Sequence, residues 1–286
     1  MQRMDQPESL QIAIIGGSGF IGNSLVKIIR NKHKNICVID KKDIDLSLDR
    51  SVEDLRQRLI EKKIDTAIIL AAVKRQDGDS KDIFNANNQI TNNISRSIQD
   101  LNCKVVYYSS CAVYGEKNEQ VKVNENHKFQ PTSYYGEHKV FSEEIYKKEL
   151  DEENLLIVRP PLIYDWQQQN GYQPGGFLAK AIKTGKIFLW GDGQEKREFI
   201  HVKDAAEVTK SLIMKKCNGD VILASGISYS YRSISENIQK ITNCQIFEKE
   251  RTGAKVDHSY SNAKLTGMIG NFDFREPFIE EKISST

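Results

Sequence analysis

The chain of 286 residues has no apolar run approaching the roughly 20 residues that a membrane-spanning helix needs. Its first ten residues carry charges but lack the apolar stretch of a secretory signal, so a cytoplasmic location is expected. An excess of one charge sign is also missing, since 41 basic against 39 acidic residues leave a formal net charge of +2. Because the two signs are interspersed, neither nucleic acid nor a membrane surface is an expected partner.

Patterns typical of disulfides and metal sites are absent as well. The five cysteines include no CxxC pair, and the five histidines form no HExxH-like pair. We therefore expect reduced thiols and no catalytic metal. The length suffices for one sizeable α/β core, or for a core with a small additional lobe.

A glycine-rich turn follows the first apolar run. Residues 12–15 (IAII) predict a buried parallel strand, and a helical pattern begins a few residues later. Between the two lie Gly16, Gly19 and Gly22. Without Cβ atoms the backbone can turn tightly and approach a pyrophosphate, which the N–H groups at the helix start then face. The spacing GxxGxxG departs from the usual GxGxxG, and the G-K-[ST] ending of an ATPase phosphate loop is absent.

An acid ends the second apolar run. Residues 36–39 (ICVI) precede Asp40, about 20 residues after the glycines, where a carboxylate accepts hydrogen bonds from the adenosine ribose. That carboxylate would repel a 2′-phosphate and so favours NAD(H) over NADP(H). Lys41 and Lys42 could reach the same phosphate, which makes the expected preference for NAD(H) slight.

Strand-like and helical runs alternate along the first half of the chain. This alternation predicts βαβ units and an α/β fold, a Rossmann-type doubly wound parallel sheet. The expected strands are 12–15, 36–39, 66–71, 104–109 and 155–159, and the expected helices lie near 19–31, 51–63, 81–101 and 133–150.

The pattern changes after residue 164. Residues 165–198 are rich in Gln, Gly and Pro, which suggests an irregular loop. Asp204 to Glu207 has the form of a capping box opening a helix to about Met214. A strand at 221–224, a helix near 232–242 and a polar tail are expected to follow. We accordingly assign 10–164 and 199–225 to a dinucleotide-binding Rossmann domain, and 165–198 and 226–286 to a smaller C-terminal substrate lobe.

Tyr135 and Lys139 lie four residues apart on a predicted helix and so share one face. A phenol has a pKa of about 10, and a nearby ammonium lowers that value, so the pair makes an acid/base. The alternative is a half-buried tyrosine with a solvated lysine. Ser110, at the end of the preceding strand, could hydrogen-bond the same substrate oxygen. Glu137 and His138 lie off this face and are expected to be surface residues.

These motifs together resemble the extended short-chain dehydrogenase/reductase family, of the NAD-dependent epimerase/dehydratase type, whose members act on nucleotide sugars. The resemblance is strong from about residue 11 to 225. It is carried by GGSGFIG (16–22), LAA (70–72), SSCAVYG (109–115), PTSYYGEHK (131–139), RPPLIY (159–164) and GDGQEKREFIHVKD (191–204).

The resemblance implies a role for each matching residue. The implied catalytic set is Ser110, Tyr135 and Lys139, with Ser110 also a substrate contact. Arg197 would meet the substrate pyrophosphate; alternatively 199–202 is a core strand and Arg197 is solvated. The implied cofactor-binding residues are Gly16, Gly19, Phe20, Ile21, Gly22, Asp40, Asp45, Leu46, Leu70, Ala71, Ala72, Asn87, Tyr135 and Lys139.

Three reactions of such enzymes compete. Sugar dehydratases carry an acidic pair after the catalytic hydroxyl residue, whereas Cys111 and Ala112 stand here. The short segment 40–55 resembles 4-ketoreductases related to GDP-fucose synthase, and SSCAVYG resembles 4-epimerases. We expect an NAD(P)-dependent nucleotide-sugar oxidoreductase that reduces a nucleotide-linked 4-keto-(6-deoxy)hexose. The alternatives are a 4-epimerase with tightly bound NAD and a non-catalytic dinucleotide-binding regulator. The resemblance also implies a homodimer, formed through the helices near 81–101 and 133–150.

Overall fold

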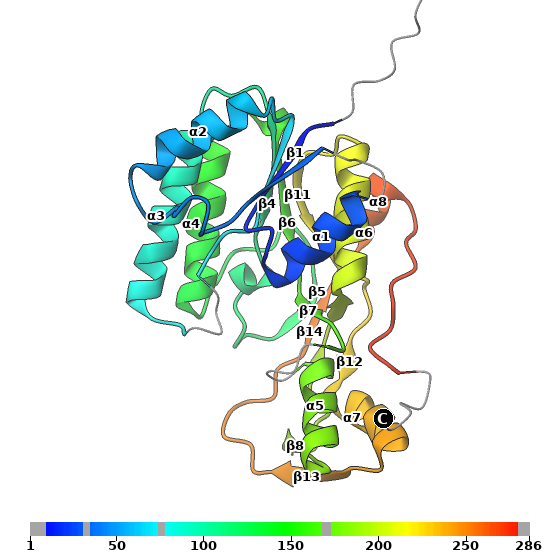
Figure 1. Ribbon diagram of the computed structural model, residues 1–286. Helices are drawn as coiled ribbons and strands as arrows, with labels where there is room; N and C mark the ends of the chain where they lie inside the picture. The colour runs from blue at the N-terminus through cyan, green and yellow to red at the C-terminus, as the bar shows by residue number, and fades with distance from the viewer. Residues whose placement is uncertain (1–9, 31–34, 74–77, 168–172, 280–286) are drawn as a thin grey trace, which may run out of the picture. The chain divides into compact units, whose positions relative to one another are not determined.

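The computed structural model describes residues 10–30, 35–73, 78–167 and 173–279, and divides them into two compact units (Figure 1). The first unit comprises the described residues up to Gly115, with Phe129–Arg159 and Thr209–Val221. The second comprises Glu116–Lys128, Pro160–Val208 and the described residues from Ile222 onward. No helix in these described ranges is long and apolar enough to cross a membrane.

A six-stranded sheet forms the centre of the first unit, in the order β11-β6-β4-β3-β1-β2. The pairs β1–β2, β1–β3, β3–β4 and β4–β6 are parallel, so the predicted α/β, Rossmann-like fold is confirmed. Strands β1, β3 and β6 are buried throughout, as expected for aliphatic runs covered on both faces. The strands are β1 (Ile12–Ile15), β2 (Ile36–Ile39), β3 (Thr66–Ile69), β4 (Lys104–Tyr108), β6 (Leu155–Arg159) and β11 (Gly219–Ile222).

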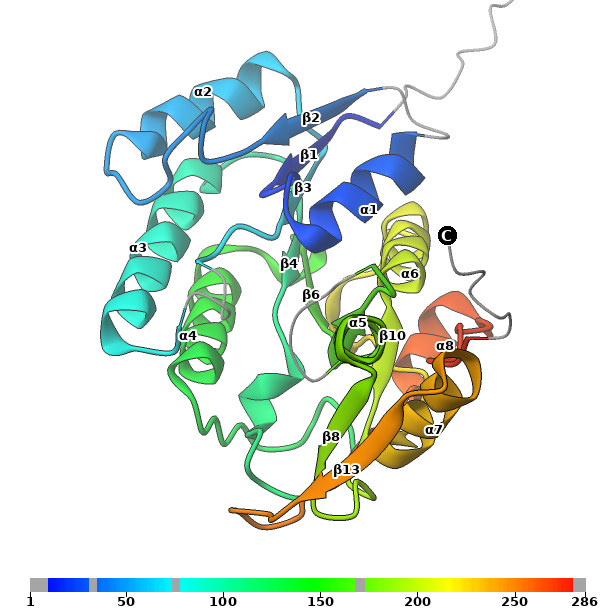
Figure 2. The same ribbon diagram turned by 60° about the horizontal axis from the view of Figure 1, so that its bottom comes forward.

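Helices cover both faces of this sheet (Figure 2). Helices α2, α3 and α4 lie on one face, and α1 with the C-terminal half of α6 lies on the other. Each expected helix occurs within a few residues of its predicted bounds. The helices are α1 (Phe20–Arg30), α2 (Ser51–Glu61), α3 (Lys81–Ile98), α4 (Tyr134–Glu149) and α6 (Val202–Met214), with the short 3₁₀ helices η2 (Cys111–Tyr114) and η3 (Glu152–Asn154).

The strand register places the candidate cofactor residues together at the carboxyl ends of the strands. Ile15 is in register with Ile39 of β2 and with Ile69 of β3. The residues that follow these three, Gly16, Asp40 and Leu70, therefore leave the sheet side by side. Since β2 and β3 flank β1 on opposite sides, the carboxyl end of β1 is the point where the direction of winding reverses. Ligands of open α/β sheets bind at such a point.

The second unit is built from short strands and helices around its own core. A parallel pair, β8 (Lys186–Trp190) and β13 (Gln245–Lys249), packs with α5 (Pro174–Thr184) and α7 (Tyr231–Thr242). The other pairs are β7 (Leu162–Tyr164) with β10 (Phe199–His201), β9 (Lys196–Arg197) with β12 (Tyr229–Ser230), and β5 (Gln120–Val123) with β14 (His258–Tyr260), and α8 (Ala263–Ile269) follows.

Residues 165–198 do not form the irregular loop expected from their composition. Within the part that the structure describes, they contain α5, β8 and β9. Pro174 opens α5, where its missing N–H and fixed φ suit the first helical turn. Gly185 ends it in the left-handed conformation, with φ of 67°. The prediction was wrong because both residues mark helix ends here rather than a loop.

Two further expectations for the C-terminal region were also wrong. Helix α6 begins at Val202, so Asp204 lies inside its first turn and is not a cap. Its carboxylate instead accepts a hydrogen bond from the backbone N–H of Arg275 at 2.7 Å and pairs with the Arg275 guanidinium. The polar tail after residue 242 contains two strands and a helix. Strands β13 and β14 pair with β8 and β5, which were not predicted from the sequence, and α8 follows β14.

Candidate active site

The glycine-rich turn is packed too tightly to accept side chains at two positions. Gly16 has a φ of +88°, and a Cβ built there would lie 2.9 Å from the backbone nitrogen of Ala71. A Cβ at Gly22, on the first turn of α1, would lie 2.6 Å from the carbonyl oxygen of Gly16. The turn therefore lies against the end of β3 with the start of α1 directly behind it. This is the cradle that a dinucleotide pyrophosphate requires.

Asp40 lies beside this turn. Its Oδ1 accepts a hydrogen bond from the backbone N–H of Ser18, at 2.9 Å. The carboxylate is therefore oriented toward the glycine-rich turn, as expected for a group that binds the adenosine ribose. The side chain of Lys41 points elsewhere, with its Nζ 3.9 Å from Asp45, and 83% of it is exposed.

The segment after Asp40 is anchored by a residue that the sequence did not single out. Asp45 accepts two hydrogen bonds from Ser47, which lower the pKa of its carboxyl group, and Leu46 is buried. From α3, the Asn93 amide donates to the carbonyls of Leu46 and Leu48, at 3.0 and 3.1 Å. Asparagines are so frequent in α3 that the sequence alone did not distinguish this one.

Asn87 holds the backbone that follows β3. Its Oδ1 accepts from the N–H of Val73 at 2.7 Å, and its Nδ2 donates to the Val73 carbonyl at 3.4 Å. Only 2% of the side chain is exposed. Both ends of the amide are thus bonded to the segment that continues Leu70, Ala71 and Ala72. Asn87 therefore holds this segment in place, and its contact with the cofactor stays a prediction.

Tyr135 and Lys139 lie on successive turns near the start of α4. The Ser133 hydroxyl caps the helix at Gly136, and Asp79 accepts a hydrogen bond from the Tyr135 N–H at 2.9 Å. Lys139 is buried, and its Nζ lies 5.7 Å from the centre of the Tyr135 ring. The lysine is therefore not solvated, which removes the alternative considered for this pair.

The Lys139 ammonium is held by the end of β4. Its Nζ donates to the carbonyl of Tyr108 at 2.8 Å and to the Tyr107 hydroxyl at 3.3 Å. Burial lowers the pKa of Lys139 to about 8, and the charge of Glu143 partly opposes that change. Ser110 follows the same strand, and its hydroxyl accepts from the Ala112 N–H at 3.1 Å and so caps η2. The first unit thus contains all three candidate catalytic residues.

His138 is not the surface residue that its position in the sequence suggested. Only 2% of it is exposed, and its Nδ1 lies 3.0 Å from Oδ1 of Asn88. Burial, and then the neighbouring Lys139 charge, lower the pKa of His138 to about 3, so the ring is neutral at physiological pH. His138 does not share the helix face of Tyr135 and Lys139, but it is still buried because α4 also packs against α3. Its neighbour Glu137 is exposed, as expected.

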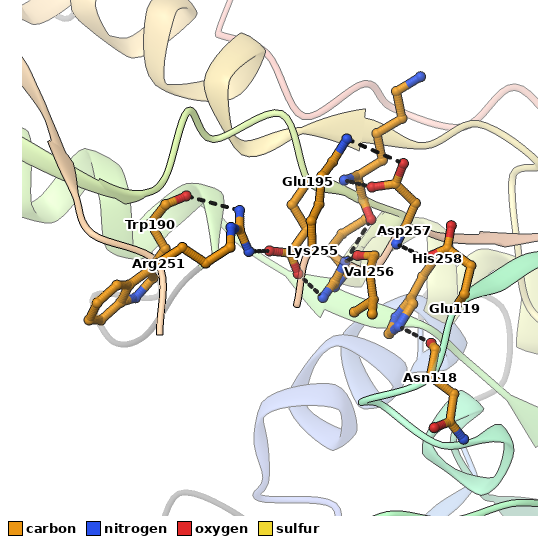
Figure 3. A network of polar contacts seen from close by, with 11 residues as sticks. Asn118, Glu119, Trp190, Glu195, Arg251, Lys255, Val256, Asp257 and His258 are labelled. Atoms are coloured by element: carbon orange, nitrogen blue, oxygen red, sulfur yellow. Dashed lines mark hydrogen bonds and ion pairs between the residues drawn. The ribbon is translucent and has the colours of Figure 1, made fainter. Parts of the chain in front are cut away.

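Arg197 lies in the second unit, and it is not solvated either. Its Nη1 donates to the carbonyl of Val256 at 2.5 Å, and its Nη2 pairs with Glu195. The same Glu195 carboxylate pairs with Nη1 of Arg251 at 2.7 Å, and Arg251 Nη2 donates to the Trp190 carbonyl at 3.0 Å (Figure 3). Two guanidinium groups therefore share one carboxylate. Arg251 could not be predicted from the sequence, because it lies 54 residues further along the chain and within none of the recognised motifs.

A match to a protein-family model decides the family. Residues 12–223 match the model described as "NAD dependent epimerase/dehydratase family". The chain belongs to this family. The resemblance predicted from the motifs, to nucleotide-sugar-modifying short-chain dehydrogenases/reductases, is confirmed.

Individual relatives of this NAD-dependent family differ in the reaction that their names state. The chain is 27% identical to "GDP-6-deoxy-D-talose 4-dehydrogenase" of Aggregatibacter actinomycetemcomitans over 279 residues, 93% of each chain. It is also 27% identical to "Putative UDP-glucose 4-epimerase" of Methanocaldococcus jannaschii over 283 residues, 91% of this chain and 92% of the relative. The two identities are equal, so they do not separate a dehydrogenase from an epimerase.

Solved structures share the fold of this chain. The UDP-glucose 4-epimerase of Thermus thermophilus, in complex with NAD, has a TM-score of 0.76 at 19% identity and covers 90% of this chain and 92% of its own. The ADP-L-glycero-D-manno-heptose-6-epimerase of Helicobacter pylori has a TM-score of 0.82 at 16% identity, covering 97% and 96%.

Proposed function

We propose that this protein is an NAD(P)-dependent nucleotide-sugar oxidoreductase that reduces a nucleotide-linked 4-keto-6-deoxyhexose. The observation that carries the proposal is the buried Lys139 ammonium beside the Tyr135 ring, one turn away on α4. A cation in that position makes a phenol into an acid/base near neutral pH. The relative named for 4-dehydrogenation of a GDP-6-deoxyhexose supports the choice of substrate, because reduction of the 4-keto sugar is the reverse of that reaction.

The chain's own residues would divide the chemistry as follows. Gly16, Gly22 and Asp40 would hold the dinucleotide, which supplies hydride when bound. Tyr135 would donate a proton to the substrate oxygen, and Ser110 would donate a hydrogen bond to the same atom. Lys139 would hold the nicotinamide ribose and keep the Tyr135 pKa low.

The substrate diphosphate would bind to Arg197 and Arg251. Their shared partner, Glu195, compensates only one of the two positive charges. A planar guanidinium with several donors in a fixed fork suits phosphate oxygens. A diphosphate entering this cluster would meet an attractive field from groups already held by β9 and the Val256 carbonyl.

The net consumption of cofactor tests the proposal. Purified protein would be incubated with NADH or NADPH and a panel of nucleotide-linked 4-keto-6-deoxyhexoses, and both oxidised cofactor and sugar product would be measured. A reductase must release oxidised cofactor after every turnover, so we expect one molecule of cofactor oxidised per product. We also expect little dinucleotide to survive purification on the protein, because the short 40–51 segment provides few residues to cover the adenosine half.

The second candidate is a 4-epimerase, which the equally similar relative from Methanocaldococcus jannaschii favours. An epimerase returns its hydride to the substrate and can keep NAD bound through many turnovers. Retention of NAD through purification, with interconversion of two 4-hydroxy sugars and no added cofactor, would replace the reductase by the epimerase.

A further inference from the structure

Glu143 is a buried carboxylate on the same face of α4 as the proposed catalytic residues. It lies four residues after Lys139 and eight after Tyr135, and only 1% of its side chain is exposed. The proposed proton transfer does not use it. A carboxylate enclosed in this way requires partners that satisfy its oxygens.

The partners of Glu143 come from the ends of two neighbouring strands. The Ser109 hydroxyl, at the end of β4, donates to Oε1 at 2.5 Å. Arg159, the last residue of β6, donates through Nε at 2.9 Å and through Nη2 at 2.7 Å. The Glu143 side chain thus joins α4 to the carboxyl ends of β4 and β6. Lys147 also lies 3.7 Å away, but its side chain is half exposed.

Arg159 also contacts two residues that follow Ser110 in the chain. Its carbonyl oxygen accepts from the Cys111 thiol at 3.3 Å, and its Nη1 donates to the Tyr114 hydroxyl at 2.9 Å. It also pairs with Asp220 at 2.8 Å. The side chains of the Glu143–Arg159 pair are therefore bonded to Ser109, directly before Ser110, and to Tyr114, four residues after it, while Cys111 contacts the Arg159 backbone.

A buried ion pair of this kind contributes little net stability to a fold. Desolvation of two charges offsets most of their attraction, and a well-packed apolar pair often stabilises a core equally well. The charged pair fixes the relative orientation of the two side chains, because a guanidinium fork and a carboxylate align in one plane. In this structure the oriented Glu143 carboxylate accepts the hydrogen bond from Ser109, the residue before Ser110.

We propose that Glu143 and Arg159 are positioning residues that hold the Ser110 turn in register with Tyr135, so that both hydroxyls reach one substrate oxygen. This inference rests on the proposed roles of Ser110 and Tyr135. It predicts that the Glu143 side chain acts on turnover through Ser110, and leaves the glycine-rich turn and its affinity for cofactor unaffected.

A double-mutant comparison tests this dependence. Glu143→Gln keeps the shape and an acceptor for Ser109 but removes the charge that aligns Arg159. We expect it to lower kcat by about 10- to 100-fold, since small misplacements of catalytic groups have effects of this size. Removal of the Glu143 charge also lowers the pKa of Lys139, so the assays are run at about pH 6, where Lys139 stays protonated. There the KM for the nucleotide sugar and the Kd for NADH should stay within about twofold. In a Ser110→Ala background the same substitution should change kcat by less than about twofold, because the residue it positions is already gone.

Two more variants complete the design. Glu144→Gln removes the adjacent, exposed carboxylate of the same helix and should leave kcat unchanged. Ser109→Ala keeps the ion pair and removes only its link to β4, so it should give a smaller loss with the same dependence on Ser110. It also tests the inference if Glu143→Gln does not fold. Equal losses in the presence and absence of Ser110 would overturn the inference and indicate a general role in folding.

A structural measurement separates this inference from the proposed function. If no member of the sugar panel is turned over by the wild-type protein, the proposed function fails. Crystal structures of wild type and Glu143→Gln then decide the positioning role. We expect Ser110 to move or to split between two conformers in the variant while Tyr135 and Lys139 stay in place. A turn at 109–114 superimposable on wild type would refute the role.

Discussion

The surroundings of Lys139 show how much one side chain's chemistry depends on its enclosure. A solvated lysine has a pKa of about 10.4 and would lie far from the catalytic range. Here burial lowers the pKa to about 8, while the carbonyl of Tyr108 keeps the ammonium in a fixed direction. The neighbouring His138 experiences the same burial and remains neutral. Among these neighbours on α4, the cation beside Tyr135 is therefore Lys139.

Tyr135→Phe should abolish turnover and leave NADH affinity within about threefold of wild type. Loss of a general acid typically costs 10²- to 10⁴-fold in rate, whereas the phenyl ring keeps the packing of α4. Steady-state kinetics with the best sugar of the panel, together with NADH titration, would measure the two effects. Turnover within about threefold of wild type would remove Tyr135 from the mechanism.

Cofactor affinity should depend on pH through Lys139. The lowered pKa means that the ammonium is present below about pH 8 and is lost as pH rises through that value. A charge-assisted hydrogen bond to the nicotinamide ribose would then be lost, which should raise the Kd for NADH by about tenfold. Titrations from pH 6 to 10 would measure this change, and Lys139→Met should show weak, pH-independent binding. A wild-type profile as flat as that of Lys139→Met would contradict the assignment.

Asp40 should make NADH bind more tightly than NADPH, by about tenfold, through hydrogen bonds to the ribose and repulsion of a 2′-phosphate. The hydrogen bond from Ser18 already orients its carboxylate toward the glycine-rich turn. Isothermal titration with both cofactors would give the ratio, and Asp40→Ala should remove the preference. Comparable or tighter NADPH binding would instead assign the 2′-position to Lys41 and Lys42, and a Lys41→Ala, Lys42→Ala double variant would verify that.

Packing between helices and strands decides where the glycine-rich turn can lie. Helix α1 approaches the turn so closely that its first glycine has backbone atoms on several sides. In contrast, α3 and α4 meet through polar pairs, such as Thr91 with Ser142 at 2.8 Å and His138 with Asn88. An apolar-stripe rule for helix packing does not anticipate the second kind of contact.

Gly22→Ala should weaken NADH binding by tenfold or more and lower stability. The added Cβ would lie 2.6 Å from Gly17 Cα and from two carbonyl oxygens, so the backbone itself must shift. Overpacking of this kind costs about 1–3 kcal/mol. Gly267→Ala is the matched control, because a Cβ there meets nothing within 4 Å on α8 and adds helix propensity. Denaturant unfolding and NADH titration would compare them; equal behaviour would show that the turn can relax.

At the scale of the whole molecule, the candidate functions are distributed between the two compact units. The glycine-rich turn, Asp40 and the Ser110, Tyr135 and Lys139 set belong to the first unit, whereas the Arg197 cluster belongs to the second. The assignment of dinucleotide to one part of the chain and nucleotide sugar to the other remains a prediction. Variants in the two units should therefore change different kinetic constants.

Arg197→Ala and Arg251→Ala should each raise the KM for the nucleotide sugar by roughly 10- to 150-fold, the range of a lost charge-assisted hydrogen bond. The Kd for NADH should be unchanged. Arg232→Ala, which removes an arginine paired with the exposed Glu248 in the same unit, is the control. An unchanged KM in both variants would mean that the cluster only joins β9 to the 251–257 segment.

The sequence by itself determined the sheet, the glycine-rich turn and the position of Tyr135 and Lys139 on one helix. These features are local: an aliphatic run forms a strand, glycines follow it, and residues four apart share a helix face. For the same reason Asp40 could be placed from its distance to the glycines.

Only the tertiary structure decided which polar residues are buried together. Glu143, Ser109 and Arg159 are far apart in sequence, and each looks like an ordinary polar residue until three elements enclose it. Arg251 meets Glu195 across 56 residues. Pro174 and Gly185 could equally have marked a loop, and packing of the helix between them against β8 and α7 settled that choice. Long-range partners of polar groups follow from the fold because burial, and not local pattern, sets the cost of leaving them unpaired.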